Sequence, residues 1–455
     1  MRTLDKGPAA GTEFRMIFDA QAELRPLSEQ YRIDDAQYRR QLEYLFAHSA
    51  FYRDKLAAAG IPDARGAGGL DNIHALPFTH KDELRGTQAE VPPFGAHLAC
   101  APDRLARVYS TSGTTGVPCF IGFTAGDLDM LATNVARGYC AAGFRAGQRI
   151  VVSANAGPFV AGAAYLGFDR IGCVTIPVGT GNTERLVGAI RNLGATGISC
   201  TPSFGLYLID WCAARGVETR ALGIRNMITA GEPGGGDAAI RARIEHAFGC
   251  VVREAMGIGD ISLTVWAEDE AGDGMSFMAR DHVHVELIDP DSGTPLPWEH
   301  GVRGELVYTA LRREAMPLLR FRSRDHVVVN MQTNPTGRTG PRVRCIGRTD
   351  DLLIVRGVNL FPTALREVFT AFRPFLGERY VIRPTRRGVS QSPPLPVTVE
   401  LGVDVRDPPS GLRERIESSI RERLQVRTSI ELVAYGTLPR GEYKVPLVDY
   451  TAVRD

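Results

Sequence analysis

The chain has 455 residues and a mass of 49.5 kDa, and its composition, 44% hydrophobic and 23% charged, is typical of a globular protein and excludes disorder as the main state. Lysine and arginine together number 53 and aspartate and glutamate 52, so the net charge is +1. Because a nearly neutral chain has no long-range field that would attract nucleic acid or anionic lipid, we expect neither nucleic acid nor a membrane as a partner.

The first hundred or so residues predict helices and loops. Apolar residues recur at helical spacing at Tyr38, Leu42, Leu45 and Phe46, and again over residues 51–56. The N-terminal stretch is charged and lacks the apolar core of a secretory signal, so we expect a cytoplasmic protein.

Short apolar runs dominate the next part of the chain, at residues 150–152, 174–176, 198–200, 227–229 and 251–252. Helical segments separate these runs, which predicts repeated βα units and hence an α/β fold with a mostly parallel sheet and helices on both faces. Ligands of such sheets bind beyond the carboxyl ends of the strands.

The uncharged run 150–168 is as long as a membrane span. It contains a serine, an asparagine, a proline and three glycines, which favour a buried strand, a turn and the start of a helix over a span.

Alternating apolar residues from position 282 predict antiparallel strands, at 282–287, 304–309 and 319–324. Loop-rich stretches follow at 332–342 and 384–395.

The chain restarts after about residue 350 with a strand at 352–355, a helix initiated by Pro362, further strands and an amphipathic helix over 412–424. We therefore expect a large N-terminal domain, residues 1–349, and a small mobile α+β domain, residues 350–455.

The eight cysteines include no C-x-x-C pair, and no histidine stands at metal-ligand spacing from them. We expect reduced, mostly buried thiols rather than a zinc site or a disulfide framework.

Lysine is scarce, since the chain has 49 arginines and only four lysines, at positions 6, 55, 81 and 444. A lysine ammonium is a compact charge on a flexible stem that can be directed at one oxygen, so its use in an arginine-rich chain suggests a specific task. Lys444 is a candidate on this ground alone; the alternative, which we prefer for Lys6 and Lys55, is that these lysines remain on the surface by chance.

Residues 110–116, Ser-Thr-Ser-Gly-Thr-Thr-Gly, present five hydroxyls and two glycines. Hydroxyls and the backbone N–H groups exposed by glycine suit the oxygens of a polyphosphate, because glycine allows close approach of the chain. The run does not match the G-x-x-x-x-G-K-[ST] phosphate loop, and taken alone it is also typical of a flexible turn.

Four further segments follow this run in order: Ala-Gly-Glu-Pro at 230–233, Phe-Arg-Ser-Arg-Asp at 321–325, Gly-Arg-Thr-Asp-Asp at 347–351 and Pro-Arg-Gly-Glu-Tyr-Lys at 439–444. Together the five motifs resemble the adenylate-forming superfamily. Residues 76–85, 112–118, 314–318 and 347–362 are similar, more narrowly, to segments of the phenylacetate-CoA ligase family. Five motifs in order are far more specific than any one of them.

The resemblance implies a reaction in two steps. A small-molecule carboxylic acid attacks the α-phosphate of ATP to give acyl-AMP and pyrophosphate, and a thiol, usually that of CoA, then displaces AMP. Both steps require negative charge on phosphate to be neutralised in the transition state. The implied cofactors are therefore ATP, Mg²⁺ and CoA.

The resemblance also implies the nucleotide-binding residues. The phosphates would be held by Ser112, Gly113, Thr114, Thr115 and Gly116, and the adenine would lie along Gly231, Glu232, Pro233, Met256 and Gly257. Asp325 would accept both ribose hydroxyls, since a carboxylate has two oxygens. The alternative for Asp325 is an ion pair with Arg322 or Arg324.

The remaining implied residues belong to the rotating domain and its hinge. Arg348 would contact the nucleotide, Asp350 would be the hinge, and Lys444 would bridge the substrate carboxylate and the α-phosphate. Arg356 and Gly357 would face CoA after rotation. Without the other motifs, residues 348–351 would be interpreted as a charged turn.

The chain departs from the family pattern at four positions. Val117 stands where many relatives have lysine, Met256 where tyrosine is usual, and Tyr443 where glycine is common. Asp260 replaces the usual glutamate, which keeps the charge for a Mg²⁺ ion on a side chain one methylene shorter.

Phe159, Tyr165 and Phe204 follow predicted strands on the ligand side and are candidates for an aromatic-acid pocket, although core packing explains each equally well. We expect a ligase that activates an aryl or arylalkyl acid and transfers it to CoA, with a homodimer possible. The alternatives are transfer to an acyl carrier protein or an amine in specialised metabolism, and a non-catalytic nucleotide-binding relative.

Overall fold

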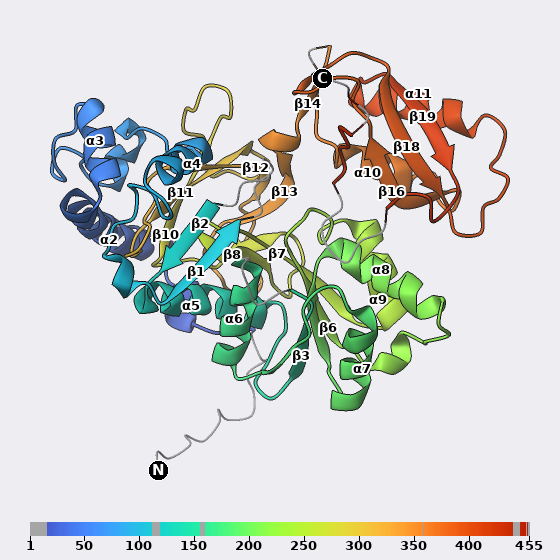
Figure 1. Ribbon diagram of the computed structural model, residues 1–455, viewed down its shortest axis with the longest axis horizontal. Coiled ribbons are helices and arrows are strands. Elements are labelled where there is room, and N and C mark those ends of the chain that lie inside the picture. Colours follow the sequence, from blue (N-terminus) through green and yellow to red (C-terminus); the bar gives the residue numbers. More distant parts are fainter. Residues whose placement is uncertain are drawn as a thin grey trace.

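The computed structural model describes residues 16–111, 119–154, 160–356, 358–439, 446–451 and 453. Two lobes are visible in Figure 1, an N-terminal lobe coloured blue to yellow and a C-terminal lobe coloured orange to red. One hydrophobic core is built only from residues beyond Leu353, which gives the C-terminal lobe an interior of its own. The expected α/β fold with a separate C-terminal domain is confirmed, and the boundary at residue 350 stays a prediction.

The described part of the N-terminal lobe contains an eleven-stranded sheet in the order β10-β11-β12-β13-β9-β8-β7-β6-β5-β3-β4. Its strands are β3 (Arg149–Val152), β4 (Val174–Pro177), β5 (Gly197–Cys200), β6 (Asn226–Thr229), β7 (Val251–Ile258), β8 (Ser262–Glu268), β9 (Met275–Phe277), β10 (Val283–Ile288), β11 (Arg303–Ala310), β12 (Phe321–Asn330) and β13 (Arg342–Arg348). β7 runs parallel to β6 and antiparallel to β8, so it joins the predicted parallel and antiparallel segments into one sheet.

Helices cover both faces of the parallel half, as the pattern of βα units predicts. They are α5 (Ala125–Ala141), α6 (Ala164–Ile171), α7 (Thr183–Leu193), α8 (Pro202–Ala213) and α9 (Ala238–Phe248). Side chains of a strand alternate between its two faces. Ile150 and Val152 of β3 pack with α5 and α6, whereas Val151 packs with α7, α8 and α9.

Local sequence signals explain where these helices begin. Thr124 and Asp127 form a reciprocal capping box at the start of α5. Asn182 caps α7, and the Asp237 carboxylate accepts two backbone N–H bonds at the start of α9. Each cap satisfies backbone donors that a helix leaves without partners at its first turn.

The N-terminal residues form helices, as expected, and a hairpin. The elements are α1 (Ala20–Glu23), α2 (Leu27–His48), α3 (Ala50–Ala58), η1 (Leu70–Ala75), α4 (Lys81–Glu90), η2 (Pro102–Arg104), β1 (Arg107–Thr111) and β2 (Cys119–Phe123). Buried Arg338 binds Glu23 at 2.8 Å and Asp269 at 3.4 Å, which anchors the start of the described chain to the antiparallel half of the sheet.

The C-terminal lobe has two three-stranded sheets in its described residues, β15-β14-β17 and β16-β18-β19. Its elements are β14 (Leu353–Val355), β15 (Val358–Leu360), α10 (Ala364–Thr370), β16 (Leu376–Ile382), β17 (Ser390–Gln391), β18 (Leu395–Leu401), α11 (Leu412–Leu424) and β19 (Thr428–Val433), and η5 (Thr349–Asp351) leads into it from the sheet. Leu412, Ile416 and Ile420 are buried, as expected for the amphipathic helix.

The eight cysteines are free thiols, and six of them are buried, in agreement with the sequence analysis. Among the described residues, no helix combines the length and apolar character needed to cross a bilayer.

Helix α6 can pack closely on α5 because residue 167 is glycine. A Cβ atom at this position would lie 2.2 Å from Val135 Cγ1. We expect Gly167→Ala to destabilise the protein by about 1–3 kcal/mol, the usual cost of overpacking, despite the helix preference for alanine. The matched control is Gly188→Ala in α7, where a Cβ meets no atom within 4 Å and should stabilise by up to about 1 kcal/mol. Denaturant unfolding of both variants measures the difference, and equal effects would contradict the packing argument.

Candidate active site

Asp325 and Arg348 lie side by side on neighbouring strands. They are register partners of the antiparallel pair β12–β13, and Arg348 Nη1 donates to Asp325 Oδ1 at 2.6 Å. The Asp325 side chain is 6% exposed and that of Arg348 34% exposed. The structure therefore brings together two of the residues that the sequence analysis placed at the nucleotide.

Burial raises the pKa of Asp325 above its ordinary value, although Arg348 opposes the rise. The alternative partners considered from sequence are engaged elsewhere, since Arg322 binds Glu305 at 2.6 Å and Arg324 lies 3.8 Å from Asp82. Asp325 is thus a buried carboxylate held by one arginine.

The predicted adenine segment lies against the start of α8. The Ser203 backbone N–H donates to Glu232 Oε1 at 2.8 Å, and the Thr201 hydroxyl caps the same helix. A carboxylate is favoured at this position because the helix N-terminus carries partial positive charge. Glu232 therefore fixes the segment 231–233 to the carboxyl end of β5, on the side of the sheet where ligands of α/β folds bind.

A pair of carboxylates, Glu254 and Glu268, lies beside the glycines that follow this segment, and no sequence motif predicted it. Gly235 and Gly236 lie so close to Glu254 that a Cβ at Gly236 would be 2.6 Å from Glu254 Oε2. Arg241 donates to both oxygens of Glu268, at 2.8 and 2.6 Å, and the Glu254 N–H donates to Glu268 as well. Desolvation and the neighbouring Glu268 raise the pKa of Glu254 to about 7.

Met256, Gly257 and Asp260 occupy the end of β7 and the turn into β8. Gly257 cannot be replaced by a larger residue, because a Cβ there would lie 2.1 Å from the Leu263 carbonyl oxygen. Met256 is half-buried and pairs with Trp266 across the strands.

Asp260 is buried, and its Oδ1 accepts from Lys81 Nζ at 2.5 Å. Lys81 begins α4, so this ion pair joins segments 179 residues apart. Lys81 lies within the family-like segment 76–85 and received no predicted role, although the scarcity of lysine is a signal that could have singled it out.

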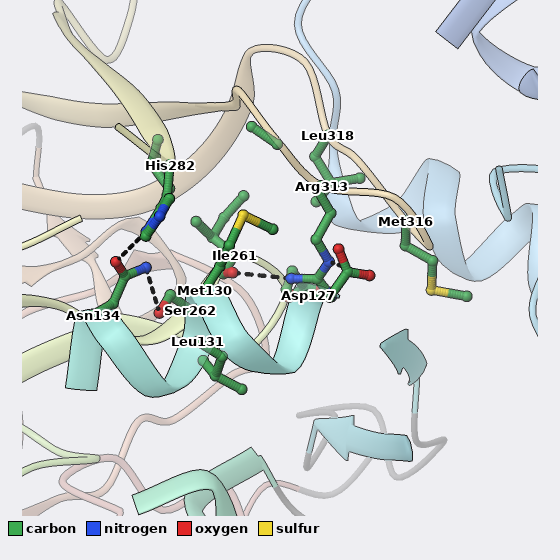
Figure 2. Close-up of a pocket in the computed structure, with 13 residues that line it drawn as sticks. Asp127, Met130, Leu131, Asn134, Ile261, Ser262, His282, Arg313, Met316 and Leu318 are labelled. Carbon is green, nitrogen blue, oxygen red and sulfur yellow. Dashed lines mark hydrogen bonds and ion pairs between the residues drawn. The ribbon is translucent and has the colours of Figure 1, made fainter. Parts of the chain in front are cut away.

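A small cavity lies behind this turn. Figure 2 shows Arg313 directed at the Ile261 carbonyl and at Asp127, and Asn134 between His282 and Ser262. Arg313 donates to the Ile261 carbonyl at 3.1 Å and to the Gly122 carbonyl at 3.2 Å. It therefore ties strand β2, which follows the glycine-rich segment, to the turn that carries Asp260.

The substrate-pocket candidates have different surroundings. Phe204 is 3% exposed and packs in the core with α7 and α9, which favours the packing alternative. Tyr165 is half-buried on α6 and donates to the Ala154 carbonyl at 3.2 Å.

Several predicted site residues lie outside the described residues, namely Ser112, Gly113, Thr114, Thr115, Gly116, Val117, Phe159, Gly357, Tyr443 and Lys444. Asp350 lies in η5 and its side chain is also outside the description, while Arg356 is exposed with a φ of 50°.

Magnesium is bound in proteins through one or two carboxylates together with substrate phosphates. Among the described residues no cluster of three or more histidine, cysteine or acidic side chains could hold a metal by itself. The buried Asp260 carboxylate fits the one-carboxylate case, in which most of the ligands come from ATP and water.

Two family models match the chain. The model described as "AMP-binding enzyme" covers residues 70–310, and "AMP-binding enzyme C-terminal domain" covers residues 357–449. The chain is also similar to a phenylacetate-coenzyme A ligase of Thermus thermophilus, with 33% identity over 447 residues that cover 94% of this chain and 97% of the relative.

Solved structures of a 2-hydroxyisobutyryl-CoA ligase resemble the chain in two states. With that ligase in the postadenylation state bound to 2-HIB-AMP, the TM-score is 0.89 at 26% identity. With the same ligase bound to 2-HIB-AMP and CoA in the thioesterification state, the TM-score is 0.72 at 27% identity. Each comparison covers 98% of this chain and 94% of the other, so the likeness includes both lobes.

Glu254 makes the stability of the site pH-dependent. Its pKa is 4.5 in an unperturbed carboxyl and about 7 in the folded protein, so the folded state binds more protons between these values and this contribution to stability falls as the pH rises through them. Glu254→Gln cannot ionise. As the pH rises from about 5 to about 8, we therefore expect the wild type to lose thermal stability relative to this variant. Thermal unfolding midpoints of the wild type and the variant at both pH values measure this change in relative stability. Glu184→Gln, at an exposed position, is the control. A constant difference between Glu254→Gln and wild type would contradict the raised pKa.

Proposed function

Because the chain belongs to the phenylacetate-CoA ligase family of AMP-binding enzymes, we propose that it activates an aryl or arylalkyl carboxylic acid. The chain is an adenylate-forming acid–thiol ligase, which uses ATP, with Mg²⁺ as the usual ion, to form an acyl-AMP and then transfers the acyl group to CoA. The aryl specificity is the proposal; it is supported by the family and by the absence of charged residues in the sequence from 150 to 168, which disfavours an acid with a second charge.

The geometry that carries the site assignment is the buried pair of Asp325 and Arg348. We propose that the ribose hydroxyls donate to Asp325, whose raised pKa reflects a carboxylate poorly solvated without them. Arg348 favours the ionised form of that carboxylate and would lie next to the nucleotide. Residues 112–116 would bind the phosphates, and the adenine would lie along 231–233, with Met256 and Gly257 beside it.

We also propose that Asp350 is the hinge between domains 1–349 and 350–455, with Lys444 acting in the first step and Arg356 and Gly357 facing CoA in the second. The TM-scores support an assignment of the lobe pose: the chain fits the postadenylation state of the related ligase better than its thioesterification state, 0.89 against 0.72, at equal coverage. The present arrangement of lobes is therefore assigned to the adenylation half of the cycle. An acyl carrier protein acceptor and a homodimer stay predictions.

Carboxylate-dependent exchange of pyrophosphate into ATP tests the proposed substrate class. We expect exchange with arylacetic or benzoic acids and little with dicarboxylic or short aliphatic acids, and we expect added CoA to convert the activated acid to its thioester. Exchange with short hydroxy acids alone would overturn the aryl assignment and leave the ligase class intact.

Substitution of Lys444 tests the proposed division of labour. We expect Lys444→Ala to slow adenylation by roughly 10²–10³, the usual loss for one transition-state donor, because its ammonium would neutralise charge at the α-phosphate. Thioester formation from preformed acyl-AMP should be nearly unchanged.

The control for this experiment is Lys55→Ala, which removes another lysine, one that pairs with Glu83. If Lys444→Ala reduced both half-reactions equally, Lys444 would not belong to the first step alone.

A further inference from the structure

The two lobes are joined by a chain of alternating charges on the side of the molecule near α9. Arg243 of α9 donates to Asp210 of α8 at 2.8 Å and also binds Glu378 of β16, in the other lobe. Glu378 accepts a second bond from Arg373 of its own lobe at 2.8 Å. The side chains across the interface therefore alternate in charge, in the order Asp210, Arg243, Glu378, Arg373.

The central carboxylate of this contact is largely shielded from water, whereas Arg243 and Asp210 are 26% and 25% exposed. The Glu378 side chain is 9% exposed, and residues of both lobes line a small cavity beside it. Asp237 and Ile240 line the cavity from the N-terminal lobe, and Arg366 and Tyr380 from the C-terminal lobe. A largely buried carboxylate that loses its cation leaves an uncompensated charge, so such a pair is far more sensitive to disruption than an exposed one.

The same interface reaches the predicted adenine segment. A Cβ at Gly234 would lie 3.2 Å from Arg366 Nη1, so this arginine of α10 rests directly against the loop that follows Pro233. The charged interface and the nucleotide segment are thus in contact through one side chain. The interface therefore holds the C-terminal lobe next to the segment proposed to bind the adenine.

We propose that Arg243 and Glu378 are positioning residues for the first half-reaction. The pair holds the C-terminal lobe in the pose assigned to adenylation, and it has to break before the lobe can rotate to the pose for thioester formation. Neither residue touches the reacting atoms; each acts through the lobe that carries residue 444. This inference rests on the proposed function, because it assigns opposite effects to the two half-reactions.

The equilibrium between the adenylation pose and the thioester-forming pose determines how large an effect each variant should have. A contact present in only one pose shifts the ratio of the poses by its differential free energy, and couplings of this kind commonly correspond to about 5–150-fold. We expect Arg243→Met and Glu378→Gln each to slow carboxylate-dependent pyrophosphate exchange by about five- to tenfold. Thioester formation from preformed acyl-AMP and CoA should be unchanged or faster, because the competing pose has been weakened.

The double variant tests whether the two residues act as a pair. If the interaction between them is what matters, Arg243→Met with Glu378→Gln should be little worse than either single variant. The control is Arg383→Met, which removes an ion pair with Asp449 inside the C-terminal lobe at 3.4 Å. It should leave both half-reactions at the wild-type rate, and unfolding midpoints exclude a general loss of stability.

Small-angle X-ray scattering of the ligand-free proteins gives a readout independent of the acid. The wild type and Arg383→Met should fit the profile calculated for the present lobe arrangement, whereas Arg243→Met and Glu378→Gln should deviate from it. Equal losses in both half-reactions, or wild-type scattering and exchange in both variants, would overturn the proposal. If the wild type showed no exchange with any acid, the proposed function would fail while scattering still decided whether the pair holds the pose.

Discussion

The buried ion pair of Asp325 and Arg348 is the constraint on which the arrangement of the site depends. A carboxylate with 6% exposure needs a cation, and the register of β12 and β13 supplies one from the last residue of the neighbouring strand. Because β13 ends at Arg348 and leads directly into η5 and the C-terminal lobe, this pair fixes the point from which the lobe departs. The carboxylate proposed to bind the nucleotide and the point where the lobe departs therefore share one interaction.

The two lobes meet through polar contacts rather than through a common core. The C-terminal lobe buries its own apolar residues, and its contacts with α8 and α9 include the ion pair of Arg243 and Glu378 beside a small cavity. An apolar interface of the same size would bind too firmly for a cycle with two poses, since released apolar surface costs free energy in proportion to its area. Ion pairs can be exchanged for water and for other partners at a smaller cost. The composition of the interface suits a contact that forms and breaks in each turnover.

Much of the fold could be predicted from local pattern, because the apolar runs near 150, 174, 198, 227 and 251 each form one strand, and the four-residue steps after Leu412 form one helix. The site could be predicted only in part. Asp325 and Arg348 were both identified through motifs, but their pairing depends on the register across the loop 332–342, which no local signal determines. The contacts of Lys81 with Asp260 and of Arg243 with Glu378 join residues 179 and 135 positions apart, so only the completed fold brings them together.

The ion pair of Lys81 and Asp260 explains why a lysine stands there in a chain that otherwise uses arginine. The Asp260 carboxylate is buried, and a buried charge without a partner is costly. Lys81 supplies that partner, and its ammonium engages one oxygen, Oδ1. An arginine in its place could hold both carboxylate oxygens in a rigid fork, whereas a lysine ammonium is a point charge on a flexible stem that engages one of them.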